Sequence, residues 1–193
     1  MKINNLNIKE KFLGKWILAI SIAWPVGGIL AIILSYAVVN LFYPEETNLI
    51  VGLVIGGAVG FAQWFILKKT FKVNGWWIVA SAIGFGLPII LVVIWFEMLG
   101  HESGLIENEI LNRVLIGALG GMLVGLLQII ILKPLSNKAL WWIVINILAW
   151  GISSGLTGIG PVNGMLFSLL GGVVLGAITG VGILWLLKFP LEK

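Results

Sequence analysis

The chain has no cysteine and no aspartate, and its single histidine is His101. Because there is no thiol, the sequence excludes disulfides, thiolate metal sites and cysteine nucleophiles. It also contains no pairing of a nucleophile with a base, no phosphate-binding glycine loop and no metal-ligand spacing. We therefore expect a protein that is not an enzyme and that uses no metal and no cofactor.

Charged residues are scarce as well. They make up 10% of the 193 residues, against about 25% in soluble domains. Hydrophobic residues make up 60%, and the mean hydropathy is +1.10. These values exclude a soluble globular protein and predict an all-α integral membrane protein, in which residues 1–193 form one transmembrane domain within the lipid bilayer. The net charge of +4 does not indicate nucleic acid, because the basic residues are not gathered in one patch.

Long apolar runs divide the chain into six predicted transmembrane helices. A helix needs about 20 mainly apolar residues to cross a bilayer. The runs are continuously apolar rather than alternating, which favours helices over barrel strands. The predicted spans cover residues 16–42, 48–67, 75–98, 109–132, 140–159 and 164–187.

The basic residues predict the orientation of these spans. With the amino terminus in the cytoplasm, eleven lysines fall in the inner segments, and the outer segments hold one basic residue, Arg113. Cytoplasmic loops carry the excess of basic residues. The sequence therefore predicts a multi-pass protein of the cell (cytoplasmic) membrane with both termini in the cytoplasm. The acidic residues of the outer segments are Glu45, Glu46, Glu97, Glu102, Glu107 and Glu109.

Tryptophans gather near the predicted cytoplasmic ends of the spans. An indole ring has an apolar body and a polar N–H, so it is well placed at the level of the lipid headgroups. We therefore predict a belt of tryptophans at the membrane surface. Its members are Trp16, Trp76, Trp77, Trp141, Trp142 and Trp185.

The stretch that begins at Gly52 returns 65 residues later. In both copies, three glycines at four-residue steps precede a glutamine, a basic turn and a Trp-Trp pair. The sequence therefore predicts an internal repeat of helix hairpins. The first copy holds Gly52, Gly56, Gly60, Gln63 and Trp76-Trp77, and the second holds Gly117, Gly121, Gly125, Gln128 and Trp141-Trp142.

A third, partial copy is divided between the two ends of the chain. Gly172, Gly176 and Thr179 repeat the pattern of glycines and a polar residue in the last span. In the first span, Trp16 is followed eight residues later by Trp24. The same spacing joins Trp77 to Phe85 and Trp142 to Trp150. Units that run in one direction imply an axis along the membrane normal, so we predict three helix pairs with pseudo-threefold symmetry.

The repeated glycines lie on one face of each predicted helix. Helices in lipid associate through close packing and hydrogen bonds, and small residues let their backbones approach. We interpret these glycines as helix-packing positions, while a stripe that faced outward would permit a homo-oligomer. The packing positions are Gly52, Gly56, Gly60, Gly117, Gly121, Gly125, Gly172 and Gly176.

The repeated polar residues predict one layer near the cytoplasmic side. From their distances to the span ends, we expect Gln63 to meet Ser81 and Gln128 to meet Asn146, with Thr179 in the third unit. A buried amide without a partner costs several kcal/mol in hydrocarbon. The layer is thus either hydrogen-bonded glue between helices or a polar site for a small solute or lipid, and the sequence leaves both interpretations open.

The GxxxGxxQ stripe, the basic turn, the Trp-Trp pair and the small-residue helix after it resemble repeats of uncharacterised bacterial multi-spanning membrane proteins. That resemblance covers the second to fifth spans and implies no activity. The size, the six spans and the inside termini are also similar to the substrate-binding membrane subunits of energy-coupling-factor vitamin transporters. In that resemblance, Ala19 and Ala23 correspond to a small-residue docking face, and the ligand is expected near the outer side.

Three functions follow as hypotheses. The first is a membrane protein whose polar inner layer passes or binds a small solute or lipid. The second is a structural or interaction protein, such as a membrane-embedded partner or an immunity factor. The third is the vitamin-binding subunit that the second resemblance implies.

Overall fold

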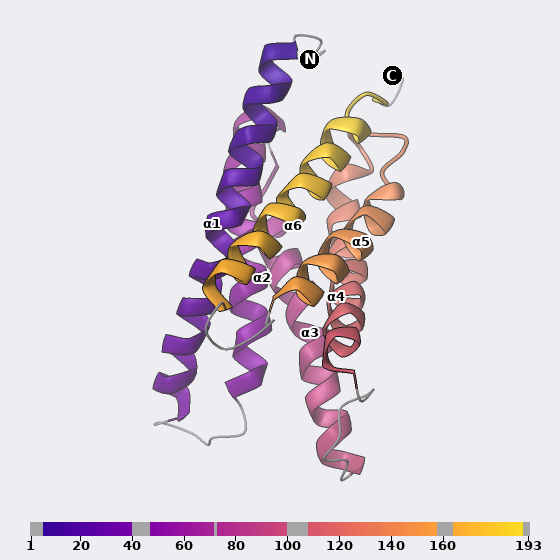
Figure 1. Cartoon of the computed structure of the whole chain (residues 1–193). Coiled ribbons are helices and arrows are strands. Elements are labelled where there is room, and N and C mark those ends of the chain that lie inside the picture. Colours follow the sequence, from indigo (N-terminus) through magenta and orange to yellow (C-terminus); the bar gives the residue numbers. More distant parts are fainter. Residues whose placement is uncertain (1–5, 40–46, 72, 100–107, 158–163, 191–193) are drawn as a thin grey trace.

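The computed structural model describes residues 6–39, 47–71, 73–99, 108–157 and 164–190, and these residues form six α-helices and no strand (Figure 1). The helices are α1 (Leu6–Val39), α2 (Thr47–Phe71), α3 (Trp76–Leu99), α4 (Glu109–Leu132), α5 (Trp141–Leu156) and α6 (Gly164–Leu186).

Each predicted span falls on one of these helices. The largest difference is at the start of α1, which begins at Leu6 although the apolar run begins at Trp16. Lysine and glutamate are good helix formers, so the polar segment before Trp16 continues the same helix. By length and composition, four helices could cross a membrane, and the apolar parts of α3 and α5, Trp76–Val92 and Trp141–Leu156, are shorter.

The six helices form a closed ring in which each one packs against its two neighbours in sequence. The ring closes where α1 packs against α6, so the first and last helices lie side by side (Figure 1). Both chain termini lie at one end of the bundle, here called the terminal end. The opposite end, where α1, α3 and α5 end and α2, α4 and α6 begin, is called the loop end.

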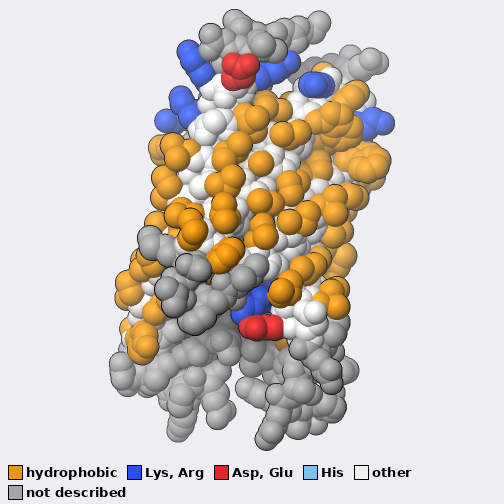
Figure 2. All heavy atoms as spheres, viewed as in Figure 1, with side chains coloured by type: hydrophobic (Ala, Val, Ile, Leu, Met, Phe, Trp, Pro, Cys, Tyr) orange, Lys and Arg blue, Asp and Glu red, His pale blue; other side chains and the backbone are white. Residues whose placement is uncertain are grey.

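Charge is distributed unequally between the two ends. Figure 2 shows apolar side chains over the middle of the visible face and lysines at the terminal end. At the loop end, the same view shows Arg and Glu side chains, and the described ion pair there joins Arg113 and Glu109. Of the acidic residues predicted outside, Glu45, Glu46, Glu102 and Glu107 lie outside the described residues.

Side-chain hydrogen bonds fix where the helices begin and how the terminal end is held. The Asn74 Oδ1 atom accepts from the N–H of Trp76 at 3.1 Å at the start of α3. At the start of α4, the Asn108 Oδ1 atom accepts from the N–H of Leu111 at 3.1 Å. After α4, the Ser136 hydroxyl donates to the Leu186 carbonyl oxygen at 2.8 Å, so the turn before α5 holds the end of α6.

The glycines of the predicted packing faces lie where neighbouring helices meet. A Cβ atom added at Gly56 would lie 2.4 Å from the Ser81 carbonyl oxygen, and one added at Gly121 would lie 2.3 Å from that of Asn146. Both distances are too short for a real contact, so these interfaces admit only glycine. Gly52, Gly60, Gly117, Gly125, Gly172 and Gly176 are also placed against the neighbouring helix, each with an atom of it closer than 3.0 Å to the added Cβ.

Three of the six tryptophans predicted at the membrane surface are instead in the core. The side chains of Trp16, Trp77 and Trp142 are 0% exposed, whereas Trp76 and Trp141 are 37% and 52% exposed. Adjacent residues of a helix point about 100° apart, because a turn takes about 3.6 residues. A Trp-Trp pair at a helix start therefore sends one ring outward and the other into the bundle.

Candidate functional site

The buried tryptophans near the terminal end donate hydrogen bonds to the polar residues of the predicted layer. Trp77 Nε1 donates to Gln63 Oε1 at 2.9 Å, and Trp142 Nε1 donates to Gln128 Oε1 at 2.6 Å. A third bond of the same kind joins the two ends of the chain, where Trp16 Nε1 donates to Thr179 Oγ1 at 3.0 Å. Each bond therefore ties one helix of a pair to the other.

Further bonds join the polar residues of the layer to partners other than those expected, and one of these bonds connects two pairs. Gln128 Nε2 donates to Ser81 Oγ at 2.9 Å, across the interface between α3 and α4. Asn146 Nδ2 donates to the Trp142 carbonyl oxygen at 2.8 Å, and Asn146 Oδ1 accepts from Trp150 Nε1. The predicted pairs of Gln63 with Ser81 and of Gln128 with Asn146 are therefore replaced, because a tryptophan N–H takes each glutamine oxygen.

The polar layer is buried and closed. Gln63 and Ser81 are 1% exposed, and Gln128, Asn146 and Thr179 are 0% exposed. Each of the five takes part in at least one side-chain hydrogen bond. None of them lines any of the three cavities described below. Within the described part of the chain, these residues are therefore shielded from solvent.

A cluster of three aromatic rings lies beside the layer, on its side toward the loop end. It consists of Trp24, Phe85 and Trp150, each eight residues after one of the buried tryptophans. The ring centroids of Phe85 and Trp150 are 4.2 Å apart, those of Trp24 and Trp150 are 5.3 Å apart, and those of Trp24 and Phe85 are 6.1 Å apart. Because the rings come from α1, α3 and α5, they fill the centre of the helix ring.

A cavity of about 760 Å³ lies on the loop-end side of this cluster, and all six helices line it. Trp24 and Phe85 form its floor. Pockets that bind small molecules typically measure about 300–1,000 Å³, so the volume is sufficient for one. The other lining residues are Pro25, Gly28, Ile29, Ile32, Val51, Ile55, Ile89, Arg113, Ile116, Gly117, Ser154, Thr157 and Ser168.

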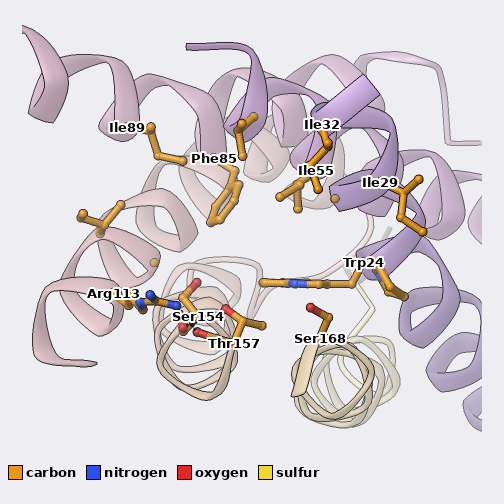
Figure 3. Close-up of a pocket in the computed structure, with 15 residues that line it drawn as sticks. Trp24, Ile29, Ile32, Ile55, Phe85, Ile89, Arg113, Ser154, Thr157 and Ser168 are labelled. Carbon is orange, nitrogen blue, oxygen red and sulfur yellow. Dashed lines mark hydrogen bonds between the residues drawn. The ribbon is translucent and has the colours of Figure 1, made fainter. Parts of the chain in front are cut away.

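The two sides of the cavity differ in chemistry. In Figure 3, Arg113, Ser154, Thr157 and Ser168 lie along one side, and Phe85, Ile89 and the isoleucines of α1 and α2 lie along the other. An Arg113 N–H donates to the Thr157 carbonyl oxygen at 2.6 Å, where α5 ends, and another donates to Glu109. The side with residues of α4, α5 and α6 is therefore polar, and the side with Phe85, Ile89 and the isoleucines of α1 and α2 is apolar.

Two smaller cavities lie elsewhere on the molecule. One of about 420 Å³ lies at the terminal end between the turn before α3 and the end of α4, with Asn74, Trp76 and Pro134 among its residues. The other, of about 400 Å³, is an apolar groove between α1 and α2 that includes Ala19 and Ala23. Among the described residues, neither is lined by a charged side chain. The described residues also contain no group of three His, Cys, Asp or Glu side chains that could hold a metal ion.

The sequence did not predict this cavity as a site. In the sequence, Arg113, the one charged residue among its described lining residues, stands out only as the single basic residue of the outer segments. Trp24 and Phe85 stand out only through the eight-residue spacing. That spacing was the available signal, because it places one large aromatic residue from each of three helices at the same depth.

No protein-family model, curated protein or solved structure matches the chain.

Proposed function

We propose that the chain is a multi-pass membrane protein with both termini in the cytoplasm, so that the cavity opens toward the outer side. Four helices have the length and composition for a membrane crossing, and the two shorter ones complete the same ring. The lysines described at the terminal end support the orientation, because basic residues concentrate on the cytoplasmic side. They are Lys9, Lys11, Lys15, Lys68, Lys69, Lys133, Lys138 and Lys188.

The bundle consists, in this proposal, of three copies of one helix pair around a pseudo-threefold axis. The pairs are α2 with α3, α4 with α5, and α6 with α1. The support is the recurrence of one hydrogen bond, from a buried tryptophan N–H to a polar residue, in each pair. The three central rings, one from each pair, lie where such an axis would run.

The function that we propose is the binding of one small amphipathic molecule in the cavity at the loop end. The observation that carries this proposal is the lining, with a polar wall that includes Arg113 opposite an apolar wall of isoleucines. A ligand with a polar head and an apolar body matches both walls, as in binding pockets that combine many apolar residues with a few polar ones. No catalysis is part of the proposal.

Binding is favoured over passage because the central axis is filled below the cavity. The Trp24–Phe85–Trp150 cluster forms the floor, and the closed polar layer follows it. A solute that crossed the protein would have to displace three aromatic rings and break hydrogen bonds of buried groups. The cavity therefore acts as a receptor for its ligand in this conformation.

A second candidate function is that of a structural or interaction protein, in which the polar layer serves only to hold the helices together. The observation in its favour is that all five predicted layer residues are buried and hydrogen-bonded. The vitamin-binding alternative also places its ligand on the outer side, where the cavity opens in the proposed orientation. Occupation of the cavity is what separates the binding functions from the structural one.

A cavity-filling substitution tests the binding proposal. A Cβ atom added at Gly28 meets no atom within 4 Å, and Gly28 lines the cavity. Gly28→Phe should therefore fill the cavity without disturbing the helices. We expect a photoactivatable C12 alcohol to label cavity residues of the wild-type protein in lipid nanodiscs in a saturable manner, with labelled peptides identified by mass spectrometry. Gly28→Phe should abolish the saturable part.

The matched control is Gly14→Phe. Gly14 also lies in α1 with no atom within 4 Å of an added Cβ, but it is not part of the cavity. This variant should label like the wild-type protein. Saturable labelling that persists in Gly28→Phe, or that is absent from the wild-type protein, would leave the structural role as the better account.

A further inference from the structure

Among the described residues, the indole N–H of Trp24 has no hydrogen-bond acceptor, unlike its buried counterparts. Five tryptophan side chains are at least nine-tenths buried, namely Trp16, Trp24, Trp77, Trp142 and Trp150. Four of them donate to a side-chain oxygen, with distances between 2.6 and 3.2 Å. Trp24 has no acceptor among the described residues, although buried tryptophan N–H groups usually find one. Its ring is 5% exposed and lines the cavity.

A second polar group of the cavity is also without a partner. Ser154 is 8% exposed, and its Oγ atom has no hydrogen bond among the described residues. Figure 3 shows Ser154 beside Arg113, with the Trp24 ring on the same side of the cavity. A fully buried polar group without a partner, such as Ser154 Oγ, costs free energy, and a ligand in this cavity would supply partners for both Ser154 and Trp24.

Arg113 completes the set with hydrogen-bond donors that remain available. A guanidinium group has five N–H donors. The described bonds use one for the Thr157 carbonyl oxygen and one for Glu109. Its side chain is 34% exposed and lines the cavity.

We infer that the ligand of this cavity is an amphiphile with an oxyanion head, a carboxylate or a phosphate, which accepts hydrogen bonds from Arg113 and from Trp24 Nε1. This inference rests on the proposed binding function and names its ligand class. The isoleucines of the opposite wall receive the apolar tail. Ser154 Oγ is a third donor along the same wall.

The charge of the wall favours an anion over a cation or a neutral molecule. Arg113 is the only charged residue that lines the cavity within the described part of the chain. Glu109, its partner, has a side chain that is 75% exposed and stands outside the lining. Hydrogen bonds between arginine and an oxyanion are charge-assisted and stronger than those to neutral groups. A cationic head would meet donors and a like charge.

A series of C12 amphiphiles with different heads tests the inference on the full-length protein in nanodiscs. The probes are dodecanol, dodecanoate, dodecyl phosphate and dodecyltrimethylammonium, each used to displace the photoactivatable C12 alcohol. We expect both anions to bind about tenfold or more tightly than dodecanol, because a hydrogen bond to a charged group contributes that factor. Dodecyltrimethylammonium should be the weakest competitor. Inorganic phosphate, the head without a tail, should not compete.

Two variants connect this preference to the named donors. Trp24→Phe keeps an aromatic floor and removes the N–H, and Arg113→Gln removes the charge. Both should bring the anions close to the affinity of dodecanol and weaken dodecanol itself less than the anions, because its neutral hydroxyl forms no charge-assisted bond. Arg113→Lys should keep part of the preference, since it keeps the charge and loses the planar fork of donors.

The outcomes separate the inference from the function on which it rests. If dodecanol and the anions compete equally in the wild-type protein, or if Trp24→Phe and Arg113→Gln both keep the preference, the oxyanion inference is wrong while binding stands. If no amphiphile competes, the binding function itself fails. A role of Arg113 that is limited to holding the end of α5 predicts that Arg113→Gln lowers the melting temperature and leaves the head preference intact, which also overturns the inference.

Discussion

At the scale of single residues, hydrogen bonds between tryptophan and glutamine hold helices together, and the sequence only partly indicated them. Gln63, Ser81, Gln128, Asn146 and Thr179 were predicted as a layer from their positions, and all five are buried near one end of the bundle. The tryptophan donors could not be predicted, because a position near a span end fits an inward and an outward ring equally well. Only the packing of α1 against α6, α2 against α3 and α4 against α5 decides which ring is buried.

The first prediction concerns Gln128, which accepts from Trp142 and donates to Ser81. Gln128→Leu leaves the Trp142 N–H buried without an acceptor, and such a group costs about 1–3 kcal/mol. We expect a clear fall in the melting temperature of the detergent-solubilised protein. In Gln128→Leu/Trp142→Phe, which removes both groups, the loss should be smaller than the sum of the two single losses. Strict additivity would show that this hydrogen bond contributes little.

At the scale of helices, composition and apolar run length were enough to predict all six elements, whereas their ends were harder to predict. The polar start of α1 is helical although it lies outside the apolar run. Hydropathy indicates whether a segment is surrounded by lipid or by water, and it does not indicate the conformation of the backbone. The close approach of helices was indicated by the glycine steps. Which helices meet was not, because a stripe of glycine carries no information about its partner.

Adjacent glycines of α2 give a matched test of that close approach. A Cβ at Gly56 would lie 2.4 Å from the Ser81 carbonyl oxygen, whereas one at Gly57 would lie 3.7 Å from its nearest neighbour, the Ala82 Cβ. Gly56→Ala should therefore destabilise the protein by about 1–3 kcal/mol, the usual cost of overpacking. Gly57→Ala should be neutral or slightly stabilising, because alanine is the better helix former. Thermal unfolding of the two variants side by side measures the difference, and equal stabilities would contradict the packing described.

At the scale of the whole molecule, closure of the ring between α1 and α6 makes the proposed threefold arrangement testable. In that arrangement, the gap between the chain ends corresponds to the turn between α2 and α3. A circular permutant that begins at Asn74, with a flexible linker between the original ends, would only move the gap from one helix pair to another. It also keeps both new termini at the terminal end.

We expect this permutant to insert and fold with a melting temperature close to that of the wild-type protein, as measured in the same detergent. The control is a permutant opened inside α4, between Gly121 and Met122, which breaks a helix and should not fold. Failure of both permutants would argue that the α2–α3 turn is not equivalent to the chain ends.

The cavity is a property of the whole ring, and this is why the sequence did not reveal it. Its residues come from all six helices and are spread from Trp24 to Ser168. No local motif indicates such a cavity. Because the chain has no cysteine of its own, a single introduced cysteine can be labelled without background.

The most direct test of the account is the labelling of a single cysteine in the cavity. Ile55 lines the cavity, so Ile55→Cys is the test variant. Leu53, two residues earlier in α2, is 37% exposed and does not line the cavity, so Leu53→Cys is the control. Maleimides react with the thiolate, which forms in water and not in lipid. A membrane-impermeant maleimide added outside intact cells should modify Ile55→Cys and not Leu53→Cys, and Gly28→Phe or dodecanoate should block the reaction. Modification of Ile55→Cys only from the inside, or modification that neither Gly28→Phe nor dodecanoate reduces, would contradict an outward-opening binding cavity.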